Sequence, residues 1–491
     1  MKKMTFLTIV GTVLICGLFF GCALFEPPEI NKNETAKIGD STDLDRKEEL
    51  ALKYLQEPLV SEDTLASFVM DFLDATASET GRSIQASPMV TITKTTKITH
   101  SVETGFAEKP ADQRSAGSTV GPGEIPFYVF TLEDHASGKT GFALTCGDMR
   151  IGNVLAVVEQ GNYDDDNPGL AVFYSQLGAY IEETVEVYNG ITQADVNNAI
   201  QRNEARHSGT PVTDVGTYAV LNAHGDLNDD SINHDKNLLE TQWHQGKPYN
   251  NFINGIKGAP KGYSYLTGCG PVAVAQVMAF HGKNRQDAGK GSLQGYDWNF
   301  MIYGKNKQAD ETIAFLMYEI GIKAGSIYLK MENSKGKGGA TATTRYGVRK
   351  AFERMGFQDT AKFKNYSLSD VRASIRKGCP VIADGSTTGF EIFGLAVSTP
   401  IGGHYWIIDG YRRMESKVKI NKSKPAVIEL IDYVHCNMGW EEGSCNGWYK
   451  SGLFKTNKIP WEDDPYKPFP RTATEDGFYQ YGLGILTGVK L

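Results

Sequence analysis

The chain has 491 residues, which is more than one ordinary hydrophobic core holds, so two or three domains are expected. Hydrophobic residues make up 41% and charged residues 22% of the chain, which is typical of a globular protein. The net charge is −8, and the sequence carries no basic stripe and no nucleic-acid-binding motif, so we expect no nucleic-acid partner.

The N-terminus has the pattern of an export signal. Lys2 and Lys3 precede an apolar run from Phe6 to Phe20 that is too short for a comfortable membrane span. Because Gly21-Cys22 ends this run in the manner of a bacterial lipoprotein signal, we expect residues 1–21 to be a signal peptide and Cys22 a lipid anchor. The alternative is a plain secretory signal cut nearby. The mature chain is expected in the cell envelope, on the surface or outer membrane, or secreted.

The first half of the chain is predicted to be a tether followed by a small α+β domain. Residues 22–45 are polar and predict a flexible tether. Hydrophobic periodicity and composition then predict helix within 47–79, strands at 87–105, 127–132, 141–146 and 154–158, and a helix at 169–188. We therefore assign residues 46–190 to one domain.

A polar stretch separates this domain from the second half. Residues 191–240 carry charged runs such as Asp226 to Asp230 and predict an exposed linker, where proteolysis concentrates. An inert linker is the alternative interpretation.

Residues 241–491 form the larger predicted domain. Helices are expected at 310–320, 346–355 and 368–377, and strands at 381–383, 389–397, 405–408 and 427–433. Five cysteines remain once Cys16 of the signal and the lipid-anchor candidate Cys22 are set aside, an odd number that leaves at least one free thiol. Cys436 and Cys445 are close enough in sequence to pair, but their spacing alone does not assign a disulfide.

The stretch Thr267-Gly268-Cys269-Gly270-Pro271 is followed by small and apolar residues and predicts a tight turn leading into a buried helix. At the positive end of a helix dipole the pKa of Cys269 is expected to fall, which favours the nucleophilic thiolate. The alternative is a buried structural cysteine.

A cysteine nucleophile needs a base, an orienting group and oxyanion donors. His404, after two glycines and before an apolar strand, is the strongest candidate for the general base and acid. Asn437 is a candidate to orient the imidazole. The Gln245 side chain and the Cys269 backbone N–H are candidate oxyanion donors. The alternative interpretation is that His404 is a structural histidine at a strand edge.

Four ordered blocks resemble the streptopain-like cysteine proteases, the C10 peptidases. The blocks are Gln245 to Asn250, Thr267 to His281, Gly402 to Gly410, and Asn437 to Tyr449. The resemblance implies a papain-like peptidase domain at 241–491. It also extends to residues 46–190, which it implies to be an inhibitory pro-domain that is cut away, so the pro-domain is an expected intramolecular partner.

By this resemblance, Cys269 is the nucleophile, His404 the base and acid, Gln245 an oxyanion donor and Asn437 a residue that orients the histidine. The family usually has tryptophan after that asparagine, whereas this chain has Met438, so the role of Asn437 is carried over less directly.

The predicted function is an exported cysteine endopeptidase that acts on proteins or peptides, needs no cofactor or metal and is made as a zymogen. Its activating cut is expected within about 190–240. Two alternatives are a non-catalytic binding or inhibitory protein on the same fold and an acyl transferase of the transglutaminase type, because a Cys–His pair serves acyl transfer as well.

Overall fold

The computed structural model describes fifteen stretches of the chain, within the unit Asp43–Leu491. These stretches are residues 46–54, 59–79, 90–102, 123–165, 167–206, 217–220, 237–253, 256, 262–333, 336–358, 362–386, 403–418, 427–440, 444–454 and 483–491. The predicted signal peptide and tether and the strand expected at 389–397 lie outside them.

The described residues form an α+β fold, as expected. The helices are α1 (Arg46–Lys53), α2 (Glu62–Glu79), α3 (Pro168–Asn189), α4 (Gln193–Arg206), α5 (Cys269–Asp287), α6 (Trp298–Tyr303), α7 (Lys307–Ala324), α8 (Arg345–Arg354), α9 (Leu368–Arg376) and the 3₁₀ helix η4 (Ser451–Phe454). The strands are β1 (Val90–Ser101), β2 (Glu124–Asp134), β3 (Lys139–Cys146), β4 (Val154–Val158), β5 (Thr217–Val220), β6 (Ser264–Tyr265), β7 (Ile327–Asn333), β8 (Gly336–Ala342), β9 (Lys364–Asn365), β10 (Val381–Ser386), β11 (Gly403–Val418), β12 (Val427–Asn437), β13 (Gly447–Lys450) and β14 (Gly484–Leu486).

One antiparallel sheet joins strands from both halves of the chain. Its order is β1-β2-β3-β4-β13-β12-β11-β10-β14-β9, with β5 paired to β11. The junction is the pairing of β4 with β13, in which Val157 lies opposite Trp448. Strands of the predicted pro-domain thus continue the sheet that contains β11, the strand of His404.

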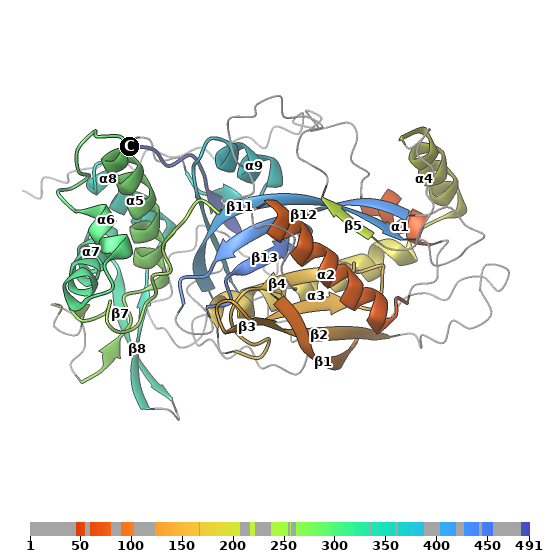
Figure 1. The fold of residues 1–491 in the computed structure, drawn as a ribbon, viewed down its shortest axis with the longest axis horizontal. Coiled ribbons are helices and arrows are strands. Elements are labelled where there is room, and N and C mark those ends of the chain that lie inside the picture. The colour runs from red at the N-terminus through yellow and green to blue at the C-terminus, as the bar shows by residue number, and fades with distance from the viewer. Residues whose placement is uncertain are drawn as a thin grey trace, which may run out of the picture. The chain divides into compact units, whose positions relative to one another are not determined.

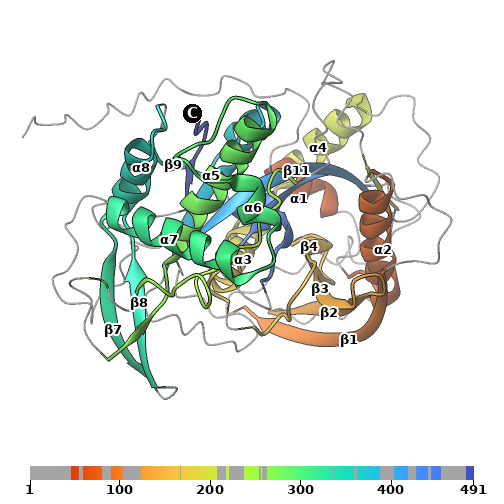
Figure 2. The ribbon, with the colours of Figure 1, turned by 60° about the vertical axis from the view of Figure 1, so that its left-hand side comes forward.

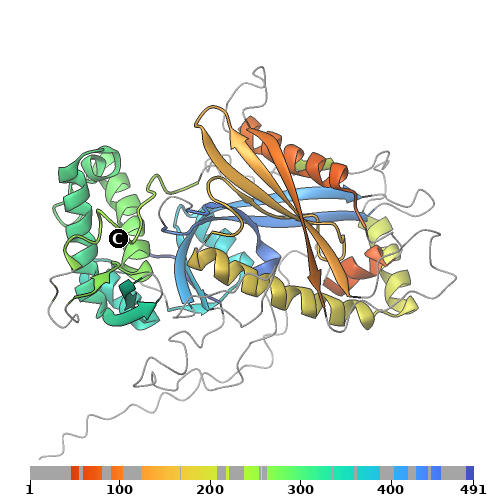
Figure 3. The same cartoon turned by 90° about the horizontal axis from the view of Figure 1, so that it is seen from below.

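Helices α2 and α3 cover the two faces of this sheet, and each reaches strands from both halves. α2 packs Phe68 and Phe72 with Ala143 of β3 and Tyr433 of β12. On the other face, α3 runs as a gold helix beneath the orange and blue strands (Figure 3). The first half of the chain therefore shares its hydrophobic cores with the second half.

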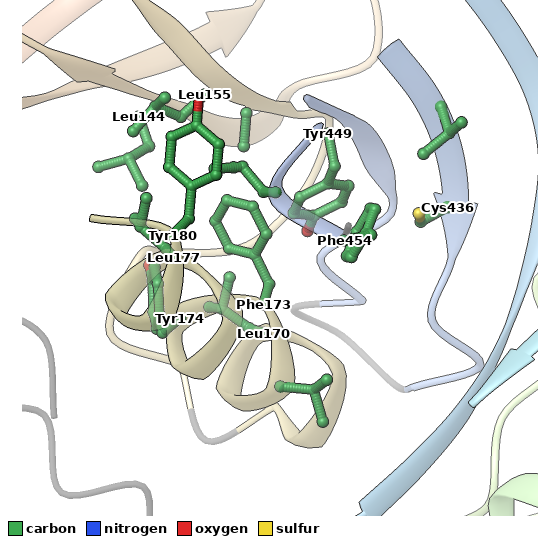
Figure 4. Close-up of a cluster of buried hydrophobic side chains, with 14 of the residues drawn as sticks. Leu144, Leu155, Leu170, Phe173, Tyr174, Leu177, Tyr180, Cys436, Tyr449 and Phe454 are labelled. Atoms are coloured by element: carbon green, nitrogen blue, oxygen red, sulfur yellow. The ribbon is translucent and has the colours of Figure 1, made fainter. Parts of the chain in front are cut away.

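The sequence before and inside α3 explains this helix. Asn167 caps it by accepting hydrogen bonds from the Gly169 and Leu170 N–H groups, and Pro168 occupies the first turn, where its missing N–H costs nothing. In the core, Phe173 points toward Tyr449, with ring centroids 4.8 Å apart (Figure 4). This packing joins α3 to β13.

The second core surrounds α5. Figures 1 and 2 show α5, α6, α7 and α8 gathered beside one end of the large sheet, with β7 and β8 extending below them. α5 is apolar on most sides because it is enclosed, with Val274 and Val277 packed among residues such as Met317 of α7 and Phe352 of α8. A small sheet of order β6-β8-β7 lies beside the start of α5.

The expected hairpin at 127–146 and the helices at 169–188, 310–320, 346–355 and 368–377 are present with small shifts of their ends. The polar stretch 191–240 differs from expectation, because it contains helix α4 and strand β5. The Thr192 N–H and hydroxyl both donate to Asp195, which stabilises the start of α4. The boundaries at 190 and 240 stay predictions.

Candidate active site

Cys269 is the first residue of α5, where the sequence placed it. Gly268 precedes it with φ of 99°, and a side chain at that position would lie 2.8 Å from the methyl group of Thr341 on β8. The turn that presents the cysteine therefore requires glycine. The Cys269 side chain is buried, with 9% of its surface exposed.

Gln245 lies next to this turn. Its backbone carbonyl accepts a hydrogen bond from the Thr267 N–H at 3.0 Å, two residues before Cys269. Gln245 is itself buried. The structure thus brings together the two sequence blocks that were predicted to supply the nucleophile and an oxyanion donor, and the oxyanion role of the Gln245 amide stays a prediction.

His404 is the second residue of β11 and is 1% exposed. Its Nε2 lies 2.7 Å from the carbonyl oxygen of Met438. A carbonyl only accepts hydrogen bonds, so in this arrangement Nε2 carries the proton and donates. The imidazole is therefore already engaged with the backbone next to Asn437.

His404 shares a face of β11 with Trp406, and Cys269 packs in the core that contains Tyr405. Side chains alternate between the two faces of a strand. Tyr405 packs in the core around α5 that also contains Cys269, whereas Trp406 packs in the core around α3. His404 shares the face of Trp406, and the two rings are nearly parallel with centroids 6.5 Å apart. In this conformation the imidazole is bonded to the Met438 carbonyl, and the thiol accepts from the Tyr405 backbone N–H.

Both reactive groups are held in their neutral forms. Burial raises the pKa of the Cys269 thiol, and this outweighs the opposing effect of the Tyr405, Gly270 and Cys269 backbone N–H groups. Burial also lowers the pKa of His404 to about 4, against the effect of its bond to Met438. The expected lowering of the thiol pKa at the helix N-terminus was wrong for this conformation, because burial dominates.

Asn437 makes its hydrogen bonds to other partners. Its Nδ2 donates to the Thr241 carbonyl at 2.9 Å, and its Oδ1 accepts from Gln276 at 3.3 Å and from the Gly439 N–H at 3.1 Å. In this conformation the Asn437 carboxamide links the Thr241 backbone to Gln276 of α5 through hydrogen bonds. The predicted role of Asn437 in orienting His404 stays a prediction.

Gln276 is a site residue that the sequence reasoning did not single out. Its Oε1 accepts from the Thr241 hydroxyl at 2.9 Å and from the Trp243 N–H at 3.1 Å, and the side chain is fully buried. The signal in the sequence is a lone amide between Ala275 and Val277 in an apolar helix. A buried polar group of this kind must be bonded to be tolerated.

The first turn of α3 lies against the peptide that follows Asn437. The Asn167 Nδ2 donates to the Ser444 carbonyl at 3.1 Å. A Cβ atom added at Gly169 would lie 2.5 Å from the sulfur of Met438, so the two residues are in close contact. The carbonyl of Met438 is the group that accepts the hydrogen bond from His404. The position where the family usually has tryptophan is thus packed against the predicted pro-domain.

The cysteines of the described residues are free thiols, namely Cys146, Cys269, Cys379, Cys436 and Cys445. Among the described residues, His, Cys, Asp and Glu side chains form no group of three or more that is placed to hold a metal ion.

A cysteine at a helix N-terminus, with a histidine on an adjacent strand, supplies the groups that thiol-dependent acyl-transfer enzymes use. Residues 243–449 match the model of the Peptidase C10 family. The match contains all four sequence blocks, which confirms the resemblance and indicates a cysteine-type peptidase. No curated protein and no solved structure matches the chain significantly.

Proposed function

We propose that the chain is an exported cysteine endopeptidase made as an inactive precursor. The observation that carries the proposal is the placement of Cys269 as the first residue of α5, inside the segment that matches a cysteine peptidase family. Cys269 is the proposed nucleophile and His404 the proposed general base and acid.

In the active form, His404 takes the thiol proton, and the Cys269 sulfur attacks the carbonyl carbon of the scissile peptide bond. The C–N bond then breaks, and the imidazolium gives its proton to the leaving amine. The acyl group stays on the sulfur as a thioester. Water, deprotonated by His404, attacks the thioester and releases the carboxylic acid product and the thiol.

The oxyanion of each tetrahedral intermediate needs hydrogen-bond donors. We assign this role to the Cys269 backbone N–H and the Gln245 side-chain amide, because the Gln245 backbone is bonded to Thr267 beside the nucleophile. Asn437 is assigned to orient His404 once the imidazole has moved off the Met438 carbonyl. This step requires Asn437 to exchange its bond to Thr241 or Gln276.

The inhibitory role of residues 46–190 is supported by three features of the described conformation. The thiol and imidazole are neutral, and the imidazole is bonded to the Met438 carbonyl. The first turn of α3 packs on Met438. Strand β4 extends the peptidase sheet. Removing this segment frees the face of β11 on which His404 lies.

Export and lipid anchoring at Cys22 rest on the sequence of residues 1–22 and remain part of the proposal. A search of the described residues finds no helix that is long and apolar enough to cross a membrane.

The proposal predicts that activity appears together with processing. The purified full-length chain, incubated and sampled over time, is expected to cleave a quenched peptide only after a shorter form accumulates. N-terminal sequencing is expected to place the start of that form between residues 191 and 240. An active form that retains residues 46–190 in one chain, or that starts outside this tract, would contradict the precursor model.

A further inference from the structure

Two buried carboxamides lie against each other where three segments of the candidate site meet. Gln276 of α5 is fully buried, and Asn437 at the end of β12 is 4% exposed. The Gln276 Nε2 donates to the Asn437 Oδ1 at 3.3 Å, and the Asn437 Nδ2 lies 3.4 Å from the Gln276 Oε1. The same Oε1 accepts from the Thr241 hydroxyl at 2.9 Å and from the Trp243 N–H at 3.1 Å. One oxygen atom of α5 thus gathers donors from two other segments.

Backbone N–H groups fix the orientation of both carboxamides. An N–H group only donates, so the Gln276 atom that faces the Trp243 N–H is the oxygen. The Gly439 N–H, 3.1 Å from Asn437, identifies the Asn437 Oδ1 in the same way. The nitrogen and the oxygen of each amide are therefore assigned by their partners.

Each segment that meets at Gln276 carries a residue of the proposed mechanism. Gln276 follows Cys269 by seven residues, which is two turns along the same face of α5. Trp243 lies two residues before Gln245, the proposed oxyanion donor. Asn437 is the residue assigned to orient the imidazole. The Gln276 amide therefore connects the nucleophile helix to the segments of two other proposed site residues.

A glutamine at this position fixes geometry more than it adds stability. A buried amide that is bonded contributes little net free energy, whereas an unbonded one is costly. Gln276 has the only polar side chain in the run from Val272 to Ala279, so the surrounding core makes no general demand for an amide. A bonded polar network in a core holds the segments that it joins in one arrangement.

We propose that Gln276 is a positioning residue that aligns Asn437 with His404 in the active form. The inference rests on the proposed peptidase function and on the role assigned there to Asn437. To orient the imidazole, the Asn437 Oδ1 accepts the Nδ1–H of His404 and gives up the Gln276 Nε2. The Asn437 Nδ2 stays on the Gln276 Oε1, which is 3.4 Å away in the present conformation. The bonds from Thr241 and Trp243 hold this oxygen in place.

The test measures hydrolysis of a quenched peptide by the full-length chain after activation and by its Q276M, N437A and Q276M/N437A variants. Each kcat is divided by the fraction of the enzyme that a thiol-directed epoxide labels at completion, so that misfolded protein does not count. We expect Q276M to lower kcat about tenfold, the effect of one hydrogen bond to a charged group, and to change KM less than about twofold. In the N437A background the same change is expected to lower kcat less than about twofold.

The pH profile separates positioning from a general loss of structure. The alkaline limb of kcat/KM reports the loss of the imidazolium proton. A hydrogen bond from the imidazolium to Asn437 favours the charged form and so raises the pKa of His404 in the active form. We therefore expect Q276M and N437A to move this limb to lower pH by the same amount, about one pH unit.

The matched control is Q286M, which removes another glutamine amide of α5. The Gln286 Oε1 also accepts a tryptophan N–H, that of Trp298 at 2.8 Å, and its Nε2 donates to Asp297 at 2.9 Å. These bonds join α5 to α6 and do not reach the proposed site residues. We expect Q286M to keep the kcat and the pH profile of the parent.

Q276M leaves the Trp243 N–H buried without its partner. Should this variant fail to fold for that reason, T241V takes its place, because it removes only the hydroxyl bond to the Gln276 Oε1. We expect T241V to lower kcat about threefold, again only when Asn437 is present.

A Q276M enzyme with the kcat and the alkaline limb of the parent overturns the role of Gln276, as does T241V with parental values where it stands in for Q276M. Equal losses in the parent and N437A backgrounds, or an N437A limb that does not move, overturn the route through Asn437. These results leave the peptidase function in place. A parent chain that hydrolyses no peptide after processing overturns that function and the inference with it.

Discussion

Replacing Cys269 with alanine is expected to lower peptide hydrolysis at least about 10⁴-fold, to the background of the assay. The reason is that no other group in the proposed mechanism can form the acyl-enzyme. Processing of the full-length chain by itself is expected to stop as well. The measurement is kcat/KM on a quenched peptide after the chain has been cut by an added protease.

The matched control for this variant is Cys379→Ala, which removes another buried free thiol two residues before β10. It is expected to change stability slightly and to retain activity. Hydrolysis that persists in the Cys269 variant would refute the assignment of the nucleophile, and equal loss in both variants would point to a general structural effect.

The second large effect is expected at His435, where a buried charged group connects three parts of the fold. Its Nδ1 lies 2.6 Å from Asp409 on β11, and its Nε2 lies 3.5 Å from Glu159, just after β4. Asp409 also accepts the Leu239 N–H at 3.2 Å. Burial opposes the charged imidazole, but the two carboxylates outweigh it and raise the pKa of His435 to about 10.

A raised pKa in the folded state means that the folded chain binds the proton more tightly than the unfolded chain does. The resulting stability is fully present below the ordinary histidine pKa of 6.5 and is lost as pH rises through about 10. We therefore expect H435Q to be less stable than the parent by roughly 3–5 kcal/mol near pH 6, with a difference that narrows toward pH 10.

The measurement is urea unfolding across this pH range, with both proteins carrying the Cys269→Ala change to prevent self-cleavage. His135 is exposed and serves as the control, so H135Q is expected to change the stability little. A difference between H435Q and its parent that is constant from pH 6 to pH 10 would contradict the buried imidazolium.

The sequence predicted the helices and strands whose ends and pairing depend on residues that are close together in the chain. The Gly-Cys-Gly-Pro stretch predicted the start of α5 because glycine and proline have strong positional preferences at a helix N-terminus. The hairpin of β2 and β3 followed from alternation and turn composition. Helix α4 was missed because its polar composition concealed the buried Val196 and Ala199, although Thr192 and Asp195 form a capping pair that the sequence contains.

Features that depend on contacts between distant segments were not predictable in the same way. The pairing of β4 with β13 and the bond between His404 and Met438 join residues with no local relation. The partners of Asn437 lie at positions 241 and 276, which no spacing rule connects to it. The thiol pKa was predicted from the helix dipole, but the enclosure of Cys269 by its surroundings decides it.

The most direct measurement of the central claim is active-site labelling of the processed protein with a thiol-directed epoxide, followed by peptide mapping in a mass spectrometer. We expect one adduct, on Cys269, that forms in step with loss of activity and fails to form in H404A or after acid unfolding. Adducts spread over Cys146, Cys379, Cys436 and Cys445, or full activity after Cys269 is labelled, would contradict the account.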